Sequence, residues 1–396
     1  MAIVLYLLVF SLYFNSTISY FFSGNLSHKS YVLAVAIIAG IMIIKSLISS
    51  KGRVSKRILR IWVSWSIILS LYYMTSLIYG IDNSLYTSFG RAMLIQVTPT
   101  IMICSLIKND TYAIDNVKKL APIVALVFTI VSFMAAFHPN STAPGGYADT
   151  DYGLDYQAIS YMASYASSLT MYYLMNWNEV GWFWVFKSKI CKFFMSGTII
   201  INILAMLISG GRGGVAVFGF LVIFMMWFYI KKNKISTNML AKVIFIACFM
   251  CIAVFFSIRY VANVSISTSG FNRIVNAIMY GESSGRDLIH ACAITIFKEK
   301  PFFGHGIGAV FYTLGNHAHS VFYDILIEAG IVGIIILFIL IYIVSKKMFR
   351  LFKRNTTNTI WIIMFLDGFV MSLFSSYYLV QLPALGAIAY ILAINI

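Results

Sequence analysis

Apolar residues fill long uninterrupted runs of this chain, and short polar segments separate the runs. Runs of roughly twenty residues lie at about 2–22, 30–50, 59–79, 92–107, 120–138, 156–175, 192–209, 213–230, 240–258, 318–345, 358–375 and 378–395. Such a run can cross a bilayer as a helix, because the hydrocarbon core is about 30 Å thick. Lipid offers no partner to exposed backbone N–H and C=O groups, and no segment alternates as barrel strands do. The pattern predicts an all-α integral membrane protein with about twelve transmembrane helices in one polytopic domain, residues 1–396.

The basic residues gather in every second loop between these runs. Lys and Arg crowd the segments 51–57, 108–119, 187–192, 231–242 and 346–354. Because positively charged loops stay on the cytoplasmic side, we expect these loops and both termini in the cytoplasm and the other loops outside. This distribution explains the net charge of +16 better than a nucleic-acid-binding face does. We therefore expect no nucleic-acid partner.

One long polar interval, residues 259–333, interrupts the apolar pattern. Four of the six histidines fall within it, in a chain where only 11% of residues are charged. Residues 259–317 are expected to form a large loop on the outer side, between predicted helices nine and ten. Ionisable groups concentrated in such a place mark functional sites, so this interval is the first place to look for chemistry.

The sequence SGGRGG at 209–214 must form a turn. A single helix over residues 191–230 would be about 60 Å long, twice the thickness of the hydrocarbon core. Glycines permit such a turn, but the turn itself does not require Arg212. The arginine either extends to lipid headgroups or holds an anionic ligand, and both interpretations stay open here.

An amphipathic helix is predicted from Arg286 to Phe297, lying along the outer surface. Arg286 and His290 are four residues apart and share a face of it. A helix N-terminus with an arginine in its first turn suits a phosphate, because N–H groups and a guanidinium act together. The alternative is that Arg286 pairs with Glu282 or Asp287.

A second group of candidates follows at the start of predicted helix ten. His317 and His319 lie two apart, and Asp324 and Glu328 fall close to one face of the helix. A histidine or carboxylate at this place could remove a proton from an attacking hydroxyl group. Zinc is a weaker interpretation, because no third ligand stands at a recognisable spacing. Glu328 has a structural alternative, in which it holds an arginine or caps a loop.

Taken in order, these pieces resemble the bacterial O-antigen polymerase and O-antigen ligase family, the Wzy-type and WaaL-type membrane glycosyltransferases. The resemblance rests on the Gly-Arg turn at 209–214, Gly-Arg at 285–286, P-x-x-G-x-G-x-G at 301–308, His-x-His at 317–319 and E-x-G-I-x-G at 328–333. Ser320 departs from the pattern, since the family more often has Asn there.

The resemblance implies a GT-C-like fold in the bacterial inner membrane, with a periplasmic active site. It implies glycan transfer from undecaprenyl pyrophosphate without a nucleotide sugar, cofactor or essential metal. Arg212 and Arg286, with His290 beside the latter, would neutralise the pyrophosphate. His319 would orient or deprotonate the acceptor hydroxyl. The assisting acid is left open among five residues: Asp149, Asp151, Asp155, Asp324 and Glu328.

The first hypothesis for function is a polymerase of lipopolysaccharide biosynthesis. It would move the growing glycan from undecaprenyl pyrophosphate to a new lipid-linked repeat unit, with inversion at the anomeric carbon. Donor, acceptor, membrane lipid and a chain-length regulator protein are the expected partners. An O-antigen ligase acting on lipid A core shares almost every feature. A lipid-linked oligosaccharide flippase is the alternative from another class, although a transporter should show matched half-repeats.

Overall fold

The computed structural model describes residues 1–11, 13–14, 17–18, 28–80, 82–137, 141–143, 147–149, 156–177, 179–180, 184–209, 211–233, 286–354 and 356–395. The helices are α1 (Ala2–Val9), α3 (His28–Ser49), α4 (Lys56–Tyr79), α5 (Ser84–Ala92), α6 (Thr98–Leu106), α7 (Thr111–Phe137), α8 (Tyr156–Met175), α9 (Lys189–Ser209), α10 (Arg212–Asn233), α13 (Arg286–Glu299), α14 (Val310–Thr313), α15 (Val321–Arg354), α16 (Thr359–Phe374) and α17 (Leu382–Ala393). A π-helical turn, Met93–Val97, joins α5 to α6. Strands β1 (Ser141–Ala143) and β2 (Tyr147–Asp149) pair as a small antiparallel hairpin.

The predicted helical membrane architecture is confirmed in its coarse form. Six helical stretches of the described residues are long and apolar enough to span a bilayer: α3, α4, α5 to α6, α7, α9 and α15. Part of α10, together with α16 and α17, forms shorter apolar helices. The predicted helix 240–258 and the first part of the predicted outer loop, 259–285, lie outside the described residues. The number of about twelve spans and the GT-C-like fold therefore stay predictions.

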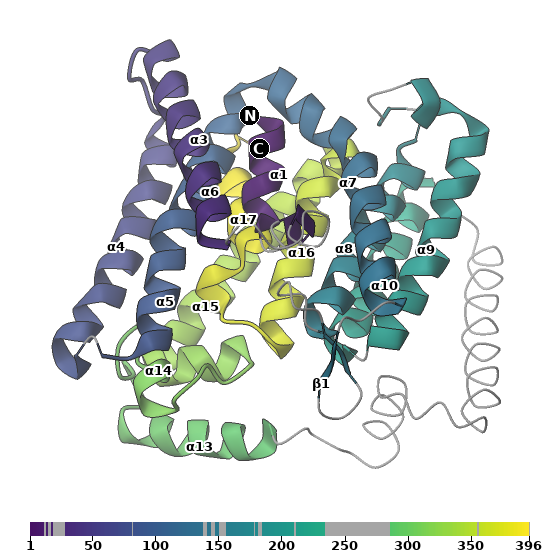
Figure 1. Ribbon diagram of the computed structural model, residues 1–396. Coiled ribbons are helices and arrows are strands. Elements are labelled where there is room, and N and C mark those ends of the chain that lie inside the picture. Colours follow the sequence, from purple (N-terminus) through teal and green to yellow (C-terminus); the bar gives the residue numbers. More distant parts are fainter. Residues whose placement is uncertain are drawn as a thin grey trace, which may run out of the picture.

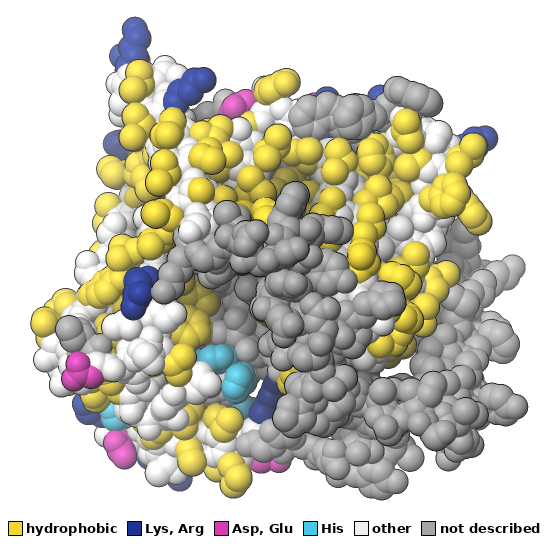
Figure 2. Space-filling model, viewed as in Figure 1, with side chains coloured by type: hydrophobic (Ala, Val, Ile, Leu, Met, Phe, Trp, Pro, Cys, Tyr) yellow, Lys and Arg dark blue, Asp and Glu magenta, His cyan; other side chains and the backbone are white. Residues whose placement is uncertain are grey.

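The two ends of the molecule differ in the side chains they carry. Figure 1 shows the α3–α4 turn and both chain ends at the upper end, and α13, α14 and β1 at the lower end. In Figure 2 a band of apolar side chains crosses the molecule, dark-blue basic side chains lie along its upper margin, and histidines appear in the lower half. The basic turns and the histidine-rich interval thus lie at opposite ends of the apolar band.

Basic side chains from three of the Lys- and Arg-rich segments, 51–57, 108–119 and 346–354, converge on the C-terminal end of α17. Lys347 Nζ donates to the Leu392 carbonyl at 2.9 Å, and Lys108 Nζ donates to the Ala393 carbonyl at 2.9 Å. Arg57 also donates to the Ile394 carbonyl, at 3.1 Å. Cations are favourable there, since the last carbonyls of a helix lack partners and carry the negative end of its dipole. This convergence ties the basic loops to one end of the fold.

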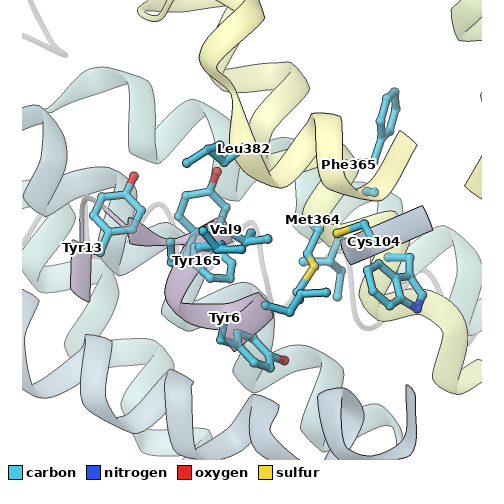
Figure 3. Packing of buried hydrophobic residues seen from close by; sticks show 14 of the residues in the cluster. Tyr6, Val9, Tyr13, Cys104, Tyr165, Met364, Phe365 and Leu382 are labelled. Atoms are coloured by element: carbon cyan, nitrogen blue, oxygen red, sulfur yellow. The ribbon is translucent and has the colours of Figure 1, made fainter. Parts of the chain in front are cut away.

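The interior is packed around α8, which contacts α7, α9, α10 and α16. Every residue from Ala158 to Thr170 is buried in α8, although many of them are Ser or Tyr. Figure 3 shows part of this interior, with Tyr165 of α8 among residues of α1, α16 and α17. By contrast, α3 and α4 expose large apolar side chains, such as Ile48 and Leu77. Such exposure is expected where a helix faces lipid.

Candidate active site

Helix α15 is broken at Gly330, and the loop before α14 fills the break. Gly330 has φ 61° and ψ −155°, which no helical residue adopts. In a regular helix the amides of Ile331 and Val332 would bond to the carbonyls four residues earlier. Here Ile331 N donates to the Pro301 carbonyl at 2.9 Å, and Val332 N donates to the Phe302 carbonyl at 3.2 Å.

The two carbonyls released by this break are satisfied by the same loop. His305 N donates to the Ile327 carbonyl at 2.8 Å, and Gly306 N donates to the Glu328 carbonyl at 2.9 Å. Four backbone groups that the break would leave unpaired inside the protein are therefore all bonded to residues 301–306. An unpaired buried N–H or C=O costs about 1–3 kcal/mol, so the loop and the broken helix stabilise each other.

Glycine is required on both sides of the contact between the loop 301–306 and the break in α15. A Cβ on Gly330 would lie 2.5 Å from the carbonyl oxygens of Pro301 and Phe302, and one on Gly304 would lie 2.4 Å from the carbonyl carbon of Glu328. Both glycines also have a positive φ. The motifs at 301–308 and 328–333 are thus two halves of one structure, which explains why each has its glycines at those spacings.

Aromatic side chains at the corner between α4 and α5 pack against the loop before α14. The rings of Tyr72 and Tyr86 stack with centroids 4.4 Å apart, and a Cβ on Gly308 would lie 2.6 Å from Tyr72. Asn83 Nδ2 donates to the Phe311 carbonyl at 2.7 Å, while its Oδ1 accepts the Tyr86 amide and caps α5. The loop and α14 are therefore fixed against α4 and α5.

Glu328 lies at the centre of this arrangement and is held by two tyrosines. Tyr377 Oη donates to Oε1 at 2.8 Å, and Tyr378 Oη donates to Oε2 at 2.7 Å. Both tyrosines come from the segment between α16 and α17, about fifty residues away in sequence. Glu328 is 1% exposed. Its described partners are the two tyrosine hydroxyls and the backbone amide of Gly308, rather than the arginine considered above, so Glu328 joins α15 both to that segment and to the loop.

Asp324 organises the histidine loop that precedes it. Its Oδ1 accepts the amide of Ala318 at 2.6 Å, and its own amide donates to the Ser320 carbonyl at 3.0 Å. Ala318 lies between the two histidines, so the carboxylate fixes the backbone that carries both. His319 has φ 56°, an uncommon left-handed conformation for a residue other than glycine. Such strain persists only where the surroundings over-determine it, and it is common at functional sites.

The ring nitrogens of the two histidines have different partners. His319 Nδ1 lies 3.3 Å from the Ser375 carbonyl, which can only accept, so this nitrogen carries the proton and donates. The amide of His319 donates to His317 Nδ1 at 3.2 Å. In the neutral ring of His319 the proton is therefore on Nδ1, and Nε2 keeps a lone pair.

Both histidines are held in the neutral form at pH 7. Burial lowers the pKa of His317 to about 3, with further lowering by His319 when that ring is protonated and by the positive charge of Arg286. Burial also lowers the pKa of His319; the bond to the Ser375 carbonyl opposes this, and the charges of Arg286 and His290 add to it. His319 thus has an unprotonated nitrogen available at neutral pH.

Helix α13 brings Arg286 and His290 to the same place. It packs against α15, and the ring of His290 stacks on Tyr323 with centroids 4.2 Å apart. Within the described part of the chain, Arg286 forms no salt bridge and His290 Nε2 has no hydrogen-bond partner. Figure 2 shows histidine side chains beside a basic side chain at the edge of a hollow in the lower half of the molecule.

The loop motif also anchors α13. His305 Nε2 lies 3.0 Å from the Ile296 carbonyl, and Tyr79 Oη lies 3.4 Å from His305 Nδ1. A carbonyl only accepts, so Nε2 donates to Ile296 and Nδ1 accepts from the tyrosine. The predicted amphipathic helix is confirmed as α13, with Ala293 buried and Leu288 75% exposed.

Arg212 is the first residue of α10, and its side chain lies outside the described part of the structure. Its neighbouring glycines press α10 against the start of α8: a Cβ on Gly214 would lie 2.2 Å from Ser160 Oγ. Ser160 Oγ also donates to the Gly211 carbonyl at 2.5 Å. The turn is confirmed, but neither interpretation of the arginine is tested. The side chain of Asp149, together with Asp151 and Asp155, also lies outside the described residues.

Sequence reasoning missed the segment that follows α16. Ser375 holds His319 through its carbonyl and donates through Oγ to Gln157 Oε1 at 3.3 Å, which connects the site to α8. The adjacent pair Tyr377 and Tyr378 was the available signal, since two phenols between apolar helices need buried partners. Within the described residues, no three His, Cys, Asp or Glu side chains gather closely enough to hold a metal ion.

Comparison with known proteins matches this part of the chain. Residues 197–338, from α9 through the break in α15, match the family model described as O-antigen ligase. No curated protein matches the chain. The matched range contains the Gly-Arg turn, α13, the interlocked loop and the two histidines, all of which the motifs had singled out. This part of the chain is therefore similar to the O-antigen ligase family.

Proposed function

We propose that this protein polymerises lipid-linked oligosaccharide repeat units at the outer face of the bacterial inner membrane. It transfers the growing glycan from undecaprenyl pyrophosphate to the terminal sugar of a new lipid-linked unit. The observation that carries the proposal is the neutral His319, with Nδ1 bound to the Ser375 carbonyl and Nε2 free to accept a proton.

His319 is the proposed general base. The acceptor hydroxyl oxygen attacks the anomeric carbon of the donor sugar, and its proton passes to His319 Nε2. The bond between that carbon and the pyrophosphate oxygen breaks, and the electron pair leaves with undecaprenyl pyrophosphate. Because the nucleophile enters opposite the leaving group, the anomeric configuration inverts. A positioned base contributes typically 10²–10⁴-fold to the rate.

Arg286 and His290 are the proposed binding groups for the pyrophosphate. Arg286 begins α13, so its guanidinium and the first amides of the helix can bind the same anion. The negative charge on the pyrophosphate grows as the glycosidic bond breaks, and a fixed positive charge is most useful at that moment. Arg212 is proposed as a second cation for this group, from its place beside the start of α8.

Asp324 and Glu328 are proposed as positioning residues rather than bases. The Oδ1 of Asp324 holds the amide between the histidines, and both oxygens of Glu328 hold tyrosine hydroxyls. A carboxylate whose oxygens accept such bonds is oriented by them and orients its partners in turn. Their contribution is to keep His319 in its strained conformation beside α13.

The active site is proposed to face the periplasm. The basic turns lie at one end of the apolar band, and α13, α14 and the histidine loop lie at the other. The positive-inside rule assigns the basic end to the cytoplasm, which leaves the histidine end outside. The donor's lipid tail would then remain in the bilayer while its pyrophosphate reaches Arg286.

The test is a reconstitution of the purified protein in lipid nanodiscs with undecaprenyl-pyrophosphate-linked repeat units alone. A ladder of glycan lengths on a gel is the expected result. Product formed only after lipid A core is added would show a ligase instead of a polymerase. Absence of product in both reactions with the cognate repeat unit, together with movement of lipid-linked units between leaflets, would support the flippase alternative.

A further inference from the structure

Helix α8 carries a polar stripe that the proposed reaction does not use. Ser164, Ser167 and Ser168 are each at most 1% exposed, in a helix surrounded by other helices. Ser164 and Ser168 are four residues apart, and Ser167 follows Ser164 by three, so the three hydroxyl groups share one face. A helix with this composition inside a bundle needs a polar partner, because apolar side chains offer none.

The partner is Asp367, near the middle of α16. It is 1% exposed, and its Oδ1 lies 3.4 Å from Ser168 Oγ, whose hydroxyl also donates to the Ser164 carbonyl at 2.8 Å and so keeps lone pairs toward Asp367. Tyr165 also interacts electrostatically with Asp367. The remaining oxygens of the group have no hydrogen-bond partner among the described residues: Asp367 Oδ2, Ser164 Oγ, Ser167 Oγ and Tyr165 Oη.

A proton on Asp367 would neutralise the carboxylate but would serve only one of these oxygens. A bound cation would instead use the lone pairs of the carboxylate and the hydroxyl groups together. Oxygen-only ligands favour hard cations, and a single carboxylate balances a single positive charge. We propose that Asp367, Tyr165, Ser164 and Ser168 form a binding site inside the helix bundle for one hard monovalent cation such as Na⁺.

The site is joined to the active site by α8 and α16. Asp367 and Ser375 are eight residues apart, which is about 12 Å along a helix. At that end Ser375 Oγ donates to Gln157 of α8, and the Ser375 carbonyl accepts from His319. A cation that draws α8 and α16 together therefore also fixes the carbonyl that orients His319. The cation site goes beyond the proposed function and does not depend on it.

The test is direct binding of radiolabelled Na⁺ to the full-length protein in nanodiscs, with choline chloride keeping the ionic strength constant. Saturable binding of about one Na⁺ per chain is expected, together with a melting temperature that rises with Na⁺ concentration by mass action. Asp367→Asn, which keeps the shape of the side chain, should abolish both effects. Ser168→Ala should weaken binding by about tenfold, as expected when a charged group loses one hydrogen-bond partner.

Two matched variants serve as controls, one for the loss of a carboxylate charge and one for the loss of a buried hydroxyl group. Asp115→Asn removes an exposed carboxylate that pairs with Lys119, and Ser132→Ala removes a buried hydroxyl of α7 that contacts Asn202 of α9. Both should bind Na⁺ as the wild type does. Absence of saturable Na⁺ binding by the wild-type protein would overturn the proposal even if Asp367→Asn failed to fold. Equal Na⁺ dependence in a folded Asp367→Asn variant would also overturn it.

Discussion

The carbonyl oxygen of Pro301 accepts the amide hydrogen of Ile331 at 2.9 Å, at the point where Gly330 breaks α15. In an uninterrupted helix that amide would bond to Ile327, whose carbonyl here accepts from His305 instead. One loop thus replaces the hydrogen bonds that a helix gives up. The break leaves Glu328, two residues before it, between the loop and the two tyrosines that follow α16.

Gly330→Ala should destabilise the protein by roughly 3 kcal/mol or more. Alanine does not adopt φ 61° with ψ −155° without strain, and its Cβ would lie 2.5 Å from the Phe302 carbonyl oxygen. The measurement is the melting temperature of the purified protein in detergent. Gly197→Ala is the matched control, because a Cβ there meets nothing within 4 Å inside α9, and it should leave the melting temperature unchanged or slightly higher. Equal melting temperatures for both variants would contradict the claim that the contact between the break in α15 and the loop 301–306 requires glycine.

His319→Ala should lower the rate of glycan transfer by at least about 10²-fold while the protein stays folded. The side chain supplies the Nε2 lone pair and is partly exposed, so its loss removes the base with little change in packing. The rate is measured from the glycan ladder, and folding from the melting temperature. A variant with wild-type turnover would exclude His319 as the base.

Arg286→Ala should raise the KM for the lipid-linked donor and lower kcat, since the guanidinium binds the leaving group more tightly as its charge develops. In the dependence of the remaining activity on pH, the fall on the acid side should also move to higher pH. The reason is that the positive charge of Arg286 helps to lower the pKa of His319, so its removal lets His319 take up a proton sooner.

Arg286→Lys is the informative partner of that variant. It keeps the positive charge but loses the planar fork, so the acid limb should stay in place while binding weakens. An unchanged pH profile in Arg286→Ala would show that the guanidinium lies too far from His319 to act on it.

Glu328→Gln should lower the melting temperature and reduce turnover without removing the acid limb that His319 produces. An amide cannot accept both tyrosine hydroxyls as a carboxylate does, and a lost bond to a charged group costs about 1.5–3 kcal/mol. Tyr377→Phe and Tyr378→Phe should show the same pattern with a smaller effect. Complete loss of turnover in a Glu328→Gln variant of normal stability would instead make Glu328 a catalytic residue.

Stability should fall when the pH is lowered below about 6.5. His317 has an unfolded pKa of 6.5 and a folded pKa of about 3, so between these values the unfolded chain binds a proton that the folded protein does not. The free energy of unfolding therefore rises with pH across this window, by at most about 1.4 kcal/mol per pH unit, and the contribution is fully present above pH 6.5. His317→Asn should flatten the dependence of melting temperature on pH in that range.

Periodicity and loop composition were enough to predict much of the fold. The run 156–175 became α8 with the same bounds, and the amphipathic stretch from Arg286 became α13. A helix is set by contacts within four residues, so its sequence carries its own signal. The predicted helix 240–258 shows the limit of this reasoning, because it lies outside the described residues and the number of spans stays a prediction.

Part of the candidate site could likewise be predicted from the sequence, and part could not. The sequence placed Arg286, His290, His319, Asp324 and Glu328 in one interval, from the residue types and the resemblance alone. It did not indicate that Ser375 orients His319 or that Tyr377 and Tyr378 hold Glu328, because those partners are about fifty residues away and belong to a different helix pair.

The sequence by itself determined a polytopic helical membrane protein, the end of the molecule at which the basic loops gather, and the resemblance to the O-antigen ligase and polymerase family. These depend on hydropathy, charge and short motifs, which are local properties of the chain. Only the tertiary structure decided how the motifs fit together. The pairing of the 301–306 backbone with the break at Gly330, the tautomer of His319 and the meeting of Asp367 with α8 all arise from contacts between distant segments. Their cause is the need to satisfy polar groups inside an apolar bundle, which only the folded arrangement can meet.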